Sequence, residues 1–465
     1  MTVGIVALAL IGGALAAMDQ TSTRWEGWVA LTFFPLLGIT LLSILLEART
    51  RPFSLHLVHL LALFVFMELA PLLQFLSDTF PRYNLVQIGA ADVLIANIIL
   101  MLWLGFYLLG YRFGCVLAKH VQLTKVTGIL CQPLNPYRVK TGGVIAFIAL
   151  AYLAYRGLGG VFTRKAYGEI VDPSNTVDFL LTTVFVRAIP LLALAALLLL
   201  ILDARKERRF GTILLLLGCA GGIFWFDNPL AAARYWTATM LVGLVAIGLL
   251  RHMKGAGLFI AAMIVGIVML PVLNIGRNDV ELFSNLTEAA TAIEPVYYLS
   301  TSGDFDAYSN LVLINSYVED HGIAWGRQLL GVFLFWIPRE FWQGKPIGTA
   351  AQVAEDVGGG ANTNIAAPLQ AEAMMNFGWI GIPLFAGVFG MMLGYLDAMY
   401  YSRRVDRGQA TPRVIDLIYV FWLGLMFFIT RGDLMSSFAY TVGITLAGLL
   451  TTMAWPSSLP HRHEV

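Results

Sequence analysis

Long apolar runs follow one another along this chain. A helix needs roughly 20 apolar residues to cross the hydrocarbon layer of a membrane. Hydrophobic residues make up 58% of the 465 residues and charged residues only 13%, so the chain lacks the polar surface that a soluble fold of this size needs. We therefore predict an all-α, polytopic integral membrane protein that forms a single membrane domain over residues 1–465. The sequence contains twelve predicted transmembrane helices, at 3–17, 28–46, 55–76, 90–111, 142–158, 179–202, 211–226, 232–250, 256–274, 379–400, 414–430 and 436–455.

The loops between these segments alternate in charge. Loops rich in Lys and Arg are retained in the cytoplasm during membrane insertion, and this rule places both termini of the chain in the cytoplasm. The first segment has no basic stretch before it and is soon followed by further spans, so we expect a retained helix and not a cleaved signal peptide. The predicted cytoplasmic loops carry Arg49 and Arg51, residues 112–140, Arg205, Lys206, Arg208 and Arg209, Arg251 and Lys254, and Arg403, Arg404, Arg407 and Arg413.

The longest predicted external loop covers residues 275–378, between the ninth and tenth predicted helices. Connections of this length are commonly functional when they are not disordered. Apolar residues recur at helical spacing from Tyr308 to Val318, which predicts an amphipathic helix on the membrane surface. Leu329–Ile337 is apolar but too short to span, so we expect a re-entrant or interfacial piece that ends at Pro338.

Charge and cysteine content exclude several classes of function. Thirty basic and 29 acidic residues give a net charge of +1, so the chain as a whole does not attract nucleic acid, and any basic function must be local. The three cysteines, Cys115, Cys131 and Cys219, are widely spaced and odd in number. They form neither a disulfide framework nor a zinc-binding pattern, and we expect no cofactor.

Two short patterns resemble metal sites, and we interpret neither as one. Asp304-Phe305-Asp306 has the Asp-x-Asp spacing that holds a divalent cation in many glycosyltransferases, but so short a match is weak and a solvated loop is the simpler interpretation. His56 and His59 lie one helical turn apart and have no third ligand nearby in the sequence. We therefore predict no bound metal and a mild effect of Asp304→Ala.

Charged residues on the predicted external face are few, and they stand at helix ends. Any one of these cations is explained by anchoring at the membrane interface, where a long basic side chain reaches the headgroups. Cations from four separate regions, taken together, are explained better by binding to an anionic lipid diphosphate than by anchoring. One guanidinium group can bind two phosphate oxygens through parallel hydrogen bonds. The candidates for diphosphate binding are Arg164 with Tyr167, Arg234, Arg339 with Lys345, and Arg431.

The sequence around these residues resembles the bacterial oligosaccharide repeat-unit polymerases of the Wzy family, and the enterobacterial common antigen polymerase branch in particular. The resemblance covers roughly residues 156–447. The chain departs from the family pattern at Gln343. Its turn at residues 431–433 resembles an Arg-Glu-Gly turn of the family, but the acidic residue occupies a different position. The matching features are Arg234 in a Pro-x-x-x-x-Arg helix start, Phe-Trp-Ile-Pro-Arg-x-x-Trp-x-x-Lys-Pro at 335–346, Phe377-Gly378-Trp379 within the span 364–397, and the turn Arg431-Gly432-Asp433.

The resemblance implies a glycosyltransferase on the periplasmic face of the bacterial inner membrane. It would move a growing glycan from undecaprenyl diphosphate to a sugar hydroxyl of a new lipid-linked unit, alongside a chain-length regulator and a flippase as partners. Fixed cations would stabilise the departing diphosphate, with Arg431 as the first candidate. A carboxylate would accept the proton of the attacking hydroxyl, and Asp433, Glu340 and Asp306 are the candidates for that role.

Two other functions remain open at this point. An O-antigen ligase, which moves a finished glycan onto a lipid core, needs nearly the same architecture and the same cations. A lipid-linked oligosaccharide flippase would instead need polar groups near the middle of the membrane and broken helices at matching positions of two halves. The sugars, the linkage and the oligomeric state do not follow from the sequence.

Overall fold

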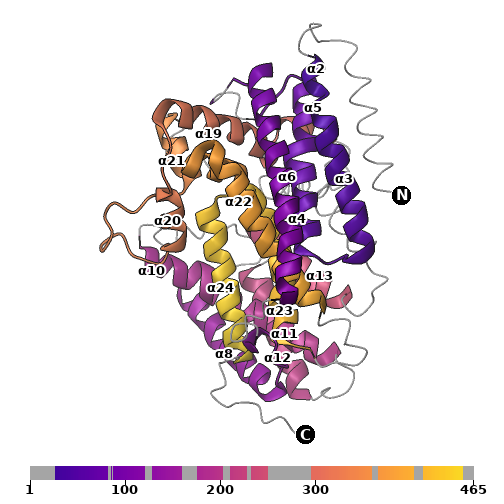
Figure 1. The fold of residues 1–465 in the computed structure, drawn as a ribbon. Helices are drawn as coiled ribbons and strands as arrows, with labels where there is room; N and C mark the ends of the chain where they lie inside the picture. Colours follow the sequence, from indigo (N-terminus) through magenta and orange to yellow (C-terminus); the bar gives the residue numbers. More distant parts are fainter. Residues whose placement is uncertain are drawn as a thin grey trace.

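The computed structural model describes residues 27–81, 85, 87–120, 128–159, 175–202, 210–227, 232–249, 295–358, 365–402 and 412–453. Within these ranges the regular structure is helical, with one isolated bridge between Pro133 and Arg413 and no strand. The predicted all-α membrane architecture is therefore confirmed for the described part of the chain (Figure 1).

Ten of the twelve predicted segments coincide with helices. Eight helices among the described residues are long and apolar enough to cross a membrane, and α12 (Phe210–Phe226) and α13 (Arg234–Leu249) are shorter. The predicted segments 3–17 and 256–274 lie outside the described residues. The eight are α2–α3 (Gly27–Ala30 and Phe33–Thr50), α4–η2–α5 (Leu55–Leu63, Phe64–Leu69 and Ala70–Leu76), α6 (Ala90–His120), α8 (Pro136–Tyr155), α10–η3–α11 (Thr176–Phe179, Leu180–Val186 and Ala188–Leu202), α22 (Leu369–Ser402), α23 (Val414–Arg431) and α24 (Leu434–Thr452).

Helices α6 and α22 pack closely against each other. They run parallel, and a Cβ placed on Gly110 would lie 2.2 Å from the carbonyl oxygen of Gly387, while one on Gly394 would lie 2.1 Å from that of Tyr111. Small residues at such a crossing let two backbones approach where lipid supplies no hydrophobic force between helices. Any larger side chain here would separate the helices.

The segment 295–358 lies along one side of the bundle (Figure 1). It consists of the short helices α18 (Pro295–Thr301), η5 (Gly303–Phe305), α20 (Arg327–Phe333) and α21 (Thr349–Asp356), and of the longer α19 (Ala307–His321). Helices α19 and α21 lie beside α22, and α20 lies beside α24. The side-chain amide of Gln74, at the end of α5, donates to the carbonyls of Leu299 and Phe305 at 3.0 and 2.9 Å. This segment therefore packs on the helix ends that the charge pattern predicts to be external.

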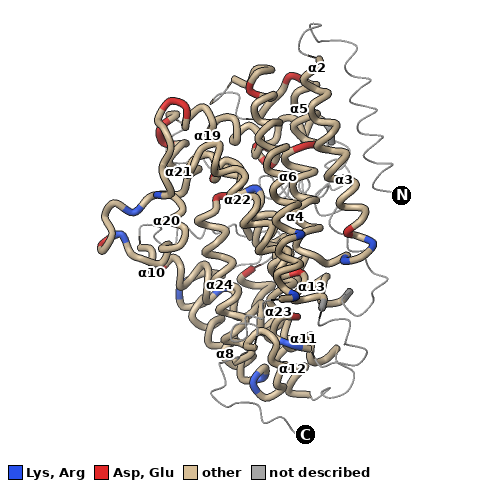
Figure 2. The backbone as a smooth tube through the Cα atoms, in the orientation of Figure 1, with Lys and Arg blue, Asp and Glu red and all other residues tan. Residues whose placement is uncertain are grey.

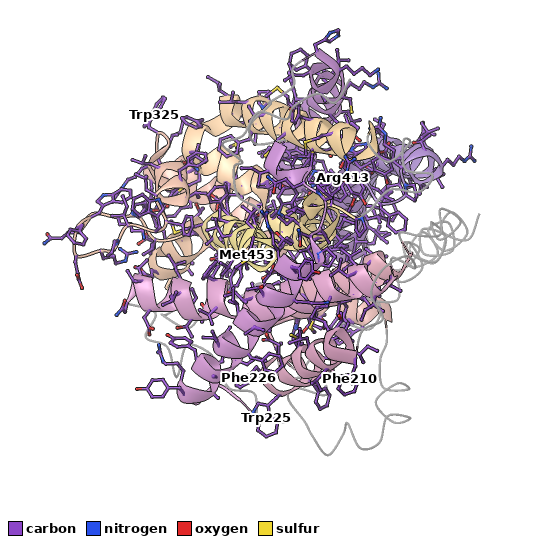
Figure 3. The ribbon with its side chains drawn as sticks, turned by 90° about the horizontal axis from the view of Figure 1, so that it is seen from below. Phe210, Trp225, Phe226, Trp325, Arg413 and Met453 are labelled. Carbon is purple, nitrogen blue, oxygen red and sulfur yellow. The ribbon has the colours of Figure 1, made fainter. Side chains whose placement is uncertain are left out.

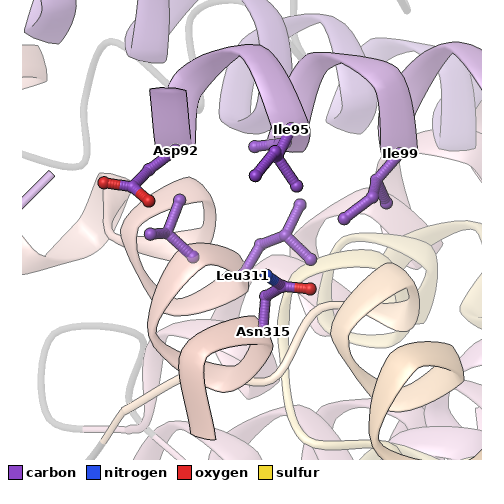
Figure 4. A pocket seen from close by; sticks show the side chains of 7 residues that line it. Asp92, Ile95, Ile99, Leu311 and Asn315 are labelled. Carbon is purple, nitrogen blue, oxygen red and sulfur yellow. The ribbon is translucent and has the colours of Figure 1, made fainter. Parts of the chain in front are cut away.

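Helix α19 exists as predicted, but its position differs from the expected one. Residues 307–315 are all buried, and Tyr308 donates to Asn97 of α6 at 3.0 Å. A small pocket lies between the two helices and is lined by Asp92, Ile99 and Asn315 among others (Figure 4). A surface helix would expose one face along its length, so the prediction that α19 lies on the membrane surface is wrong for these residues.

Aromatic side chains mark the two ends of α12. Phe210 begins this helix and Trp225 stands near its end, and both are exposed on the periphery of the bundle (Figure 3). Trp and other aromatic residues favour the boundary between lipid and water, where their rings rest at the level of the headgroups. At 17 residues, α12 is shorter than the roughly 20 residues that cross a bilayer.

Candidate functional site

Two of the predicted cations, Arg234 and Arg431, are brought together by the acidic pair Asp304 and Asp306. Arg431 is the last residue of α23, and its Nη2 donates to Asp306 Oδ1 at 2.8 Å and to the Gly303 carbonyl at 2.7 Å. Arg234 is the first residue of α13 and forms an ion pair with Asp304. Two helix ends far apart in the sequence thus meet on one short acidic segment, and we name these four residues the arginine–aspartate cluster.

The backbone around η5 explains how two carboxylates so close in sequence serve two arginines. Ser302 caps η5, since its hydroxyl accepts the backbone N–H of Asp304. Tyr298 donates to Asp304 Oδ2 at 2.5 Å, and the ring of Phe305 packs against that of Phe66 with centroids 5.4 Å apart. The single turn of η5 is therefore anchored on both sides of Phe305, and its carboxylates are held in place.

Burial within the cluster is asymmetric. The side chains of Asp306 and Asp304 are 1% and 8% exposed, whereas those of Arg431 and Arg234 are 29% and 31% exposed. The carboxylates are thus enclosed while the guanidinium groups keep a face toward the surroundings. Nε of Arg431 is buried and has no hydrogen-bond partner among the described residues. The prediction of a solvated Asp-x-Asp loop is wrong, because both carboxylates are buried against arginines.

This geometry changes the interpretation of Asp306. A proton acceptor for a sugar hydroxyl has to reach the substrate, but the carboxylate of Asp306 is enclosed and already accepts a charge-assisted hydrogen bond from Arg431. Asp306 is therefore better suited to position Arg431 than to take up a proton. Glu340, another predicted acceptor, is exposed on the loop after α20.

Asp433 caps the start of α24. Its Oδ2 accepts the backbone N–H of Ser436 at 3.1 Å, and its Oδ1 lies against Gly348, where a Cβ would be only 2.4 Å away. Burial raises the pKa of this carboxyl above its ordinary value, although the donors of Ser436 oppose the shift. Asp433 thus begins α24 beside the turn that carries Arg431, and it is partly exposed there.

A second carboxylate, Glu372, lies beside this turn and was not predicted. It stands in the first turn of α22, is 1% exposed, and accepts from the hydroxyl of Thr349 at 2.8 Å and from the backbone N–H of Leu434 at 3.2 Å. In the sequence the span is expected to begin at residue 379, which leaves Glu372 in the external loop, whereas the helix begins at Leu369. A lone acid among alanines and methionines is the signal that could have identified it.

The cations Arg339 and Lys345 lie apart from the cluster and are held by their own loop. Nζ of Lys345 donates to the carbonyls of Phe335 and Ile337 at 2.6 and 2.8 Å. Arg339 donates to the carbonyl of Lys345 at 2.8 Å. Burial, followed by the nearby charge of Arg339, lowers the pKa of Lys345. Both cations therefore fold the loop 335–346, and no contact among the described residues joins them to Arg431.

Two further charged residues in the predicted spans, Arg187 and Glu68, have partners on other segments. Arg187 forms a buried ion pair with Asp227 and stacks over Trp236, with its guanidinium carbon 4.5 Å from the ring centroid. Thr40 donates to Glu68 at 2.6 Å. Both contacts join residues in or beside different helices, so these polar side chains contribute to interhelical packing. The predicted diphosphate ligands Arg164 and Tyr167 lie outside the described residues.

Metal ligands do not gather in the described ranges. No group of three or more His, Cys, Asp or Glu residues there is arranged to hold a metal ion. The ring nitrogen Nδ1 of His56 lies 2.8 Å from the Tyr107 hydroxyl and that of His59 lies 2.9 Å from the Thr430 hydroxyl. The two histidines thus have separate partners on α6 and α23.

Comparison with known proteins adds no relative. No protein-family model matches the chain, and neither a curated protein nor a solved structure shows significant similarity to it.

Proposed function

We propose that this protein is a glycosyltransferase that polymerises undecaprenyl-diphosphate-linked oligosaccharide repeat units on the periplasmic face of the bacterial inner membrane. The observation that carries the proposal is the arginine–aspartate cluster. Arg234 begins α13 and Arg431 ends α23, and they form ion pairs with Asp304 and Asp306. About a third of each arginine side chain is exposed. Paired guanidinium groups at the end of a membrane bundle suit a lipid-borne diphosphate.

The reaction requires charge stabilisation more than any other help from the protein. The bond between the anomeric carbon of the donor glycan and the diphosphate oxygen breaks, and a bond from that carbon to the acceptor hydroxyl forms. Negative charge develops on the leaving diphosphate, and fixed guanidinium groups stabilise it without having to reorganise. Asp304 and Asp306 keep Arg234 and Arg431 in position before the substrate arrives.

The hydroxyl proton of the acceptor sugar needs a carboxylate that the arginines leave available. Asp306 is enclosed by its pairing with Arg431. Glu340 is exposed, and Asp433 stands two residues beyond Arg431 in the same turn. We therefore retain Glu340 and Asp433 as the proton-acceptor candidates.

A ligase and a flippase would use the same lipid-linked substrate, and product analysis separates them from a polymerase. In a strain that lacks this protein, we expect carrier lipid bearing a single repeat unit to accumulate on the external side, and polymer to disappear. Accumulation of long chains on the carrier would identify a ligase instead. Single units trapped on the cytoplasmic side would identify a flippase. Either of these results would contradict the proposal.

A further inference from the structure

Large apolar side chains are exposed on the segment that follows α19. Two of them, Trp325 and Phe341, are 78% and 83% exposed, more than Leu217 on the outer side of the apolar helix α12, at 60%. Leaving such side chains in water costs roughly 1.5–3 kcal/mol each relative to full burial. The exposed residues, which we name the apolar ledge, are Trp325, Leu330, Phe333, Trp336 and Phe341.

The ledge is built on a rigid base. The backbone N–H of Ala324 donates to the Met375 carbonyl at 2.8 Å and that of Gly326 to the Asn376 carbonyl at 3.1 Å. The side chain of Asn376 accepts the N–H of Leu329 at 2.9 Å. Between these bonds Trp325 has φ of 50°, a conformation that costs a non-glycine residue energy, and its ring points away from the bundle (Figure 3).

The ledge is continuous with the outer surfaces of two spans. Phe333 packs edge-on against Phe438, with ring centroids 5.7 Å apart, and Phe438 belongs to the second turn of α24. On the other side Ile323 lies against Gly378 of α22, and the next residue but one, Ile380, is 77% exposed. The ledge therefore lies level with Gly378 of α22 and with the first turns of α24.

Cations accompany the aromatic rings. The loop 335–346 projects beside α20 and carries Lys and Arg in Figure 2. Arg339 in this loop and Arg327 at the start of α20 are exposed, whereas Lys345 is buried and folds the loop. Aromatic rings together with Lys or Arg typify protein segments at the boundary between headgroups and acyl chains. A purely aqueous loop would not need this combination.

We propose that the apolar ledge is inserted into the headgroup–acyl boundary of the bilayer leaflet on the side of the arginine–aspartate cluster. The occupant of this surface is bilayer lipid, because the ledge contacts Phe438 of α24 and lies beside the part of α22 that exposes Ile380. The ledge thereby fixes the depth of the cluster, since Gly331 of α20 packs against Met435, close to Arg431. This inference does not depend on the proposed activity.

Site-directed spin labelling tests the depth of the ledge. Cys115, Cys131 and Cys219 are replaced by alanine, and single cysteines are introduced as Trp336→Cys and Phe341→Cys in the full-length protein. If the cysteine-free background is unstable, the buried Cys219 is retained. The labelled protein is reconstituted in vesicles of phosphatidylethanolamine and phosphatidylglycerol, and collisions of the label with oxygen and with a water-soluble nickel chelate are measured.

Two further positions provide the scale. Ile380→Cys, on α22, reports the lipid value, and Glu319→Cys, at the exposed end of α19, reports the water value. We expect labels at 336 and 341 to favour oxygen over nickel, with ratios closer to that of position 380 than to that of position 319. A ratio like that of position 319 would show a water-facing loop and overturn the proposal. Protection from both reagents would show a protein contact, in this copy or another, and would overturn it as well.

Discussion

Nη2 of Arg431 donates to Oδ1 of Asp306 at 2.8 Å, across 125 residues of sequence. The carboxylate is enclosed and the guanidinium is partly exposed. This relationship makes Asp306 a positioning residue whose charge decides where the exposed face of Arg431 lies. Arg234 and Asp304 repeat the arrangement on the neighbouring helix end.

Arg431→Lys should abolish most activity while leaving insertion intact. Nη2 of Arg431 makes both contacts within the protein, to Gly303 and to Asp306. Lysine keeps the charge but loses the planar guanidinium that can bind two diphosphate oxygens at once, and loss of one such donor costs on the order of 10²-fold in rate. Polymer ladders at equal membrane expression measure the effect, with the exposed Arg112→Lys at the opposite end of the bundle as the matched control. A wild-type ladder from Arg431→Lys would reduce this residue to an interfacial anchor.

Asp306→Asn and Arg431→Lys should show strong coupling. Because the two side chains form one unit, the double variant should lose little more activity than the worse single variant, with a coupling energy of roughly 0.5–3 kcal/mol. Asp304→Asn with Arg431→Lys should be closer to additive, since Asp304 serves Arg234. If Asp304 and Asp306 showed equal coupling energies with Arg431, the result would contradict the assignment of each carboxylate to its own arginine. The sequence predicts a mild effect of Asp304→Ala. Because Asp304 pairs with Arg234 in the structure, we now expect this variant to lose activity, measured by the same polymer ladders.

Activity should persist in a strong chelator. If guanidinium groups alone neutralise the diphosphate, no divalent cation is needed in the transition state. Purified protein assayed with lipid-linked repeat units, with and without the chelator, should give the same rate. Loss of activity that magnesium or manganese restores would contradict the expectation and reopen a metal role for Asp304 and Asp306.

Asp433→Asn should alter the dependence of stability on pH. The pKa of Asp433 is higher in the folded protein than its ordinary value of 3.8, so its contribution to stability is present at low pH and declines as the pH rises through the folded-state pKa. Asparagine also caps helices but does not ionise, so the variant should lose this decline. Wild type and Asp433→Asn are heated at pH values below and above the folded-state pKa, and the protein that remains dispersed is measured by chromatography. Asp320→Asn, at an exposed position, is the control. Parallel profiles for wild type and Asp433→Asn would contradict the prediction.

Reporter fusions test the orientation. A fusion after Asp356 should report the external side, and one at Arg407, which lies outside the described residues, should report the cytoplasm. Asp356 is the last residue of α21, in the segment that packs beside the cluster. A cytoplasmic signal at Asp356 would place the cluster on the wrong side for periplasmic chemistry.

The sequence alone determined the helical segments and the residues at their ends. Hydropathy is a local property, because each span has to be apolar along its own length. For that reason ten predicted segments coincide with described helices, and Arg234 and Arg431 stand at helix ends as expected.

The tertiary structure decided which of these ends meet. Asp304 and Asp306 look like a solvated loop in sequence, yet packing of Phe305 against Phe66 buries them beside two arginines. Glu372 looks like a loop residue until Thr349 and Leu434 are seen to enclose it. Such pairings join residues far apart in the chain, and their energy depends on burial and geometry that no local pattern contains.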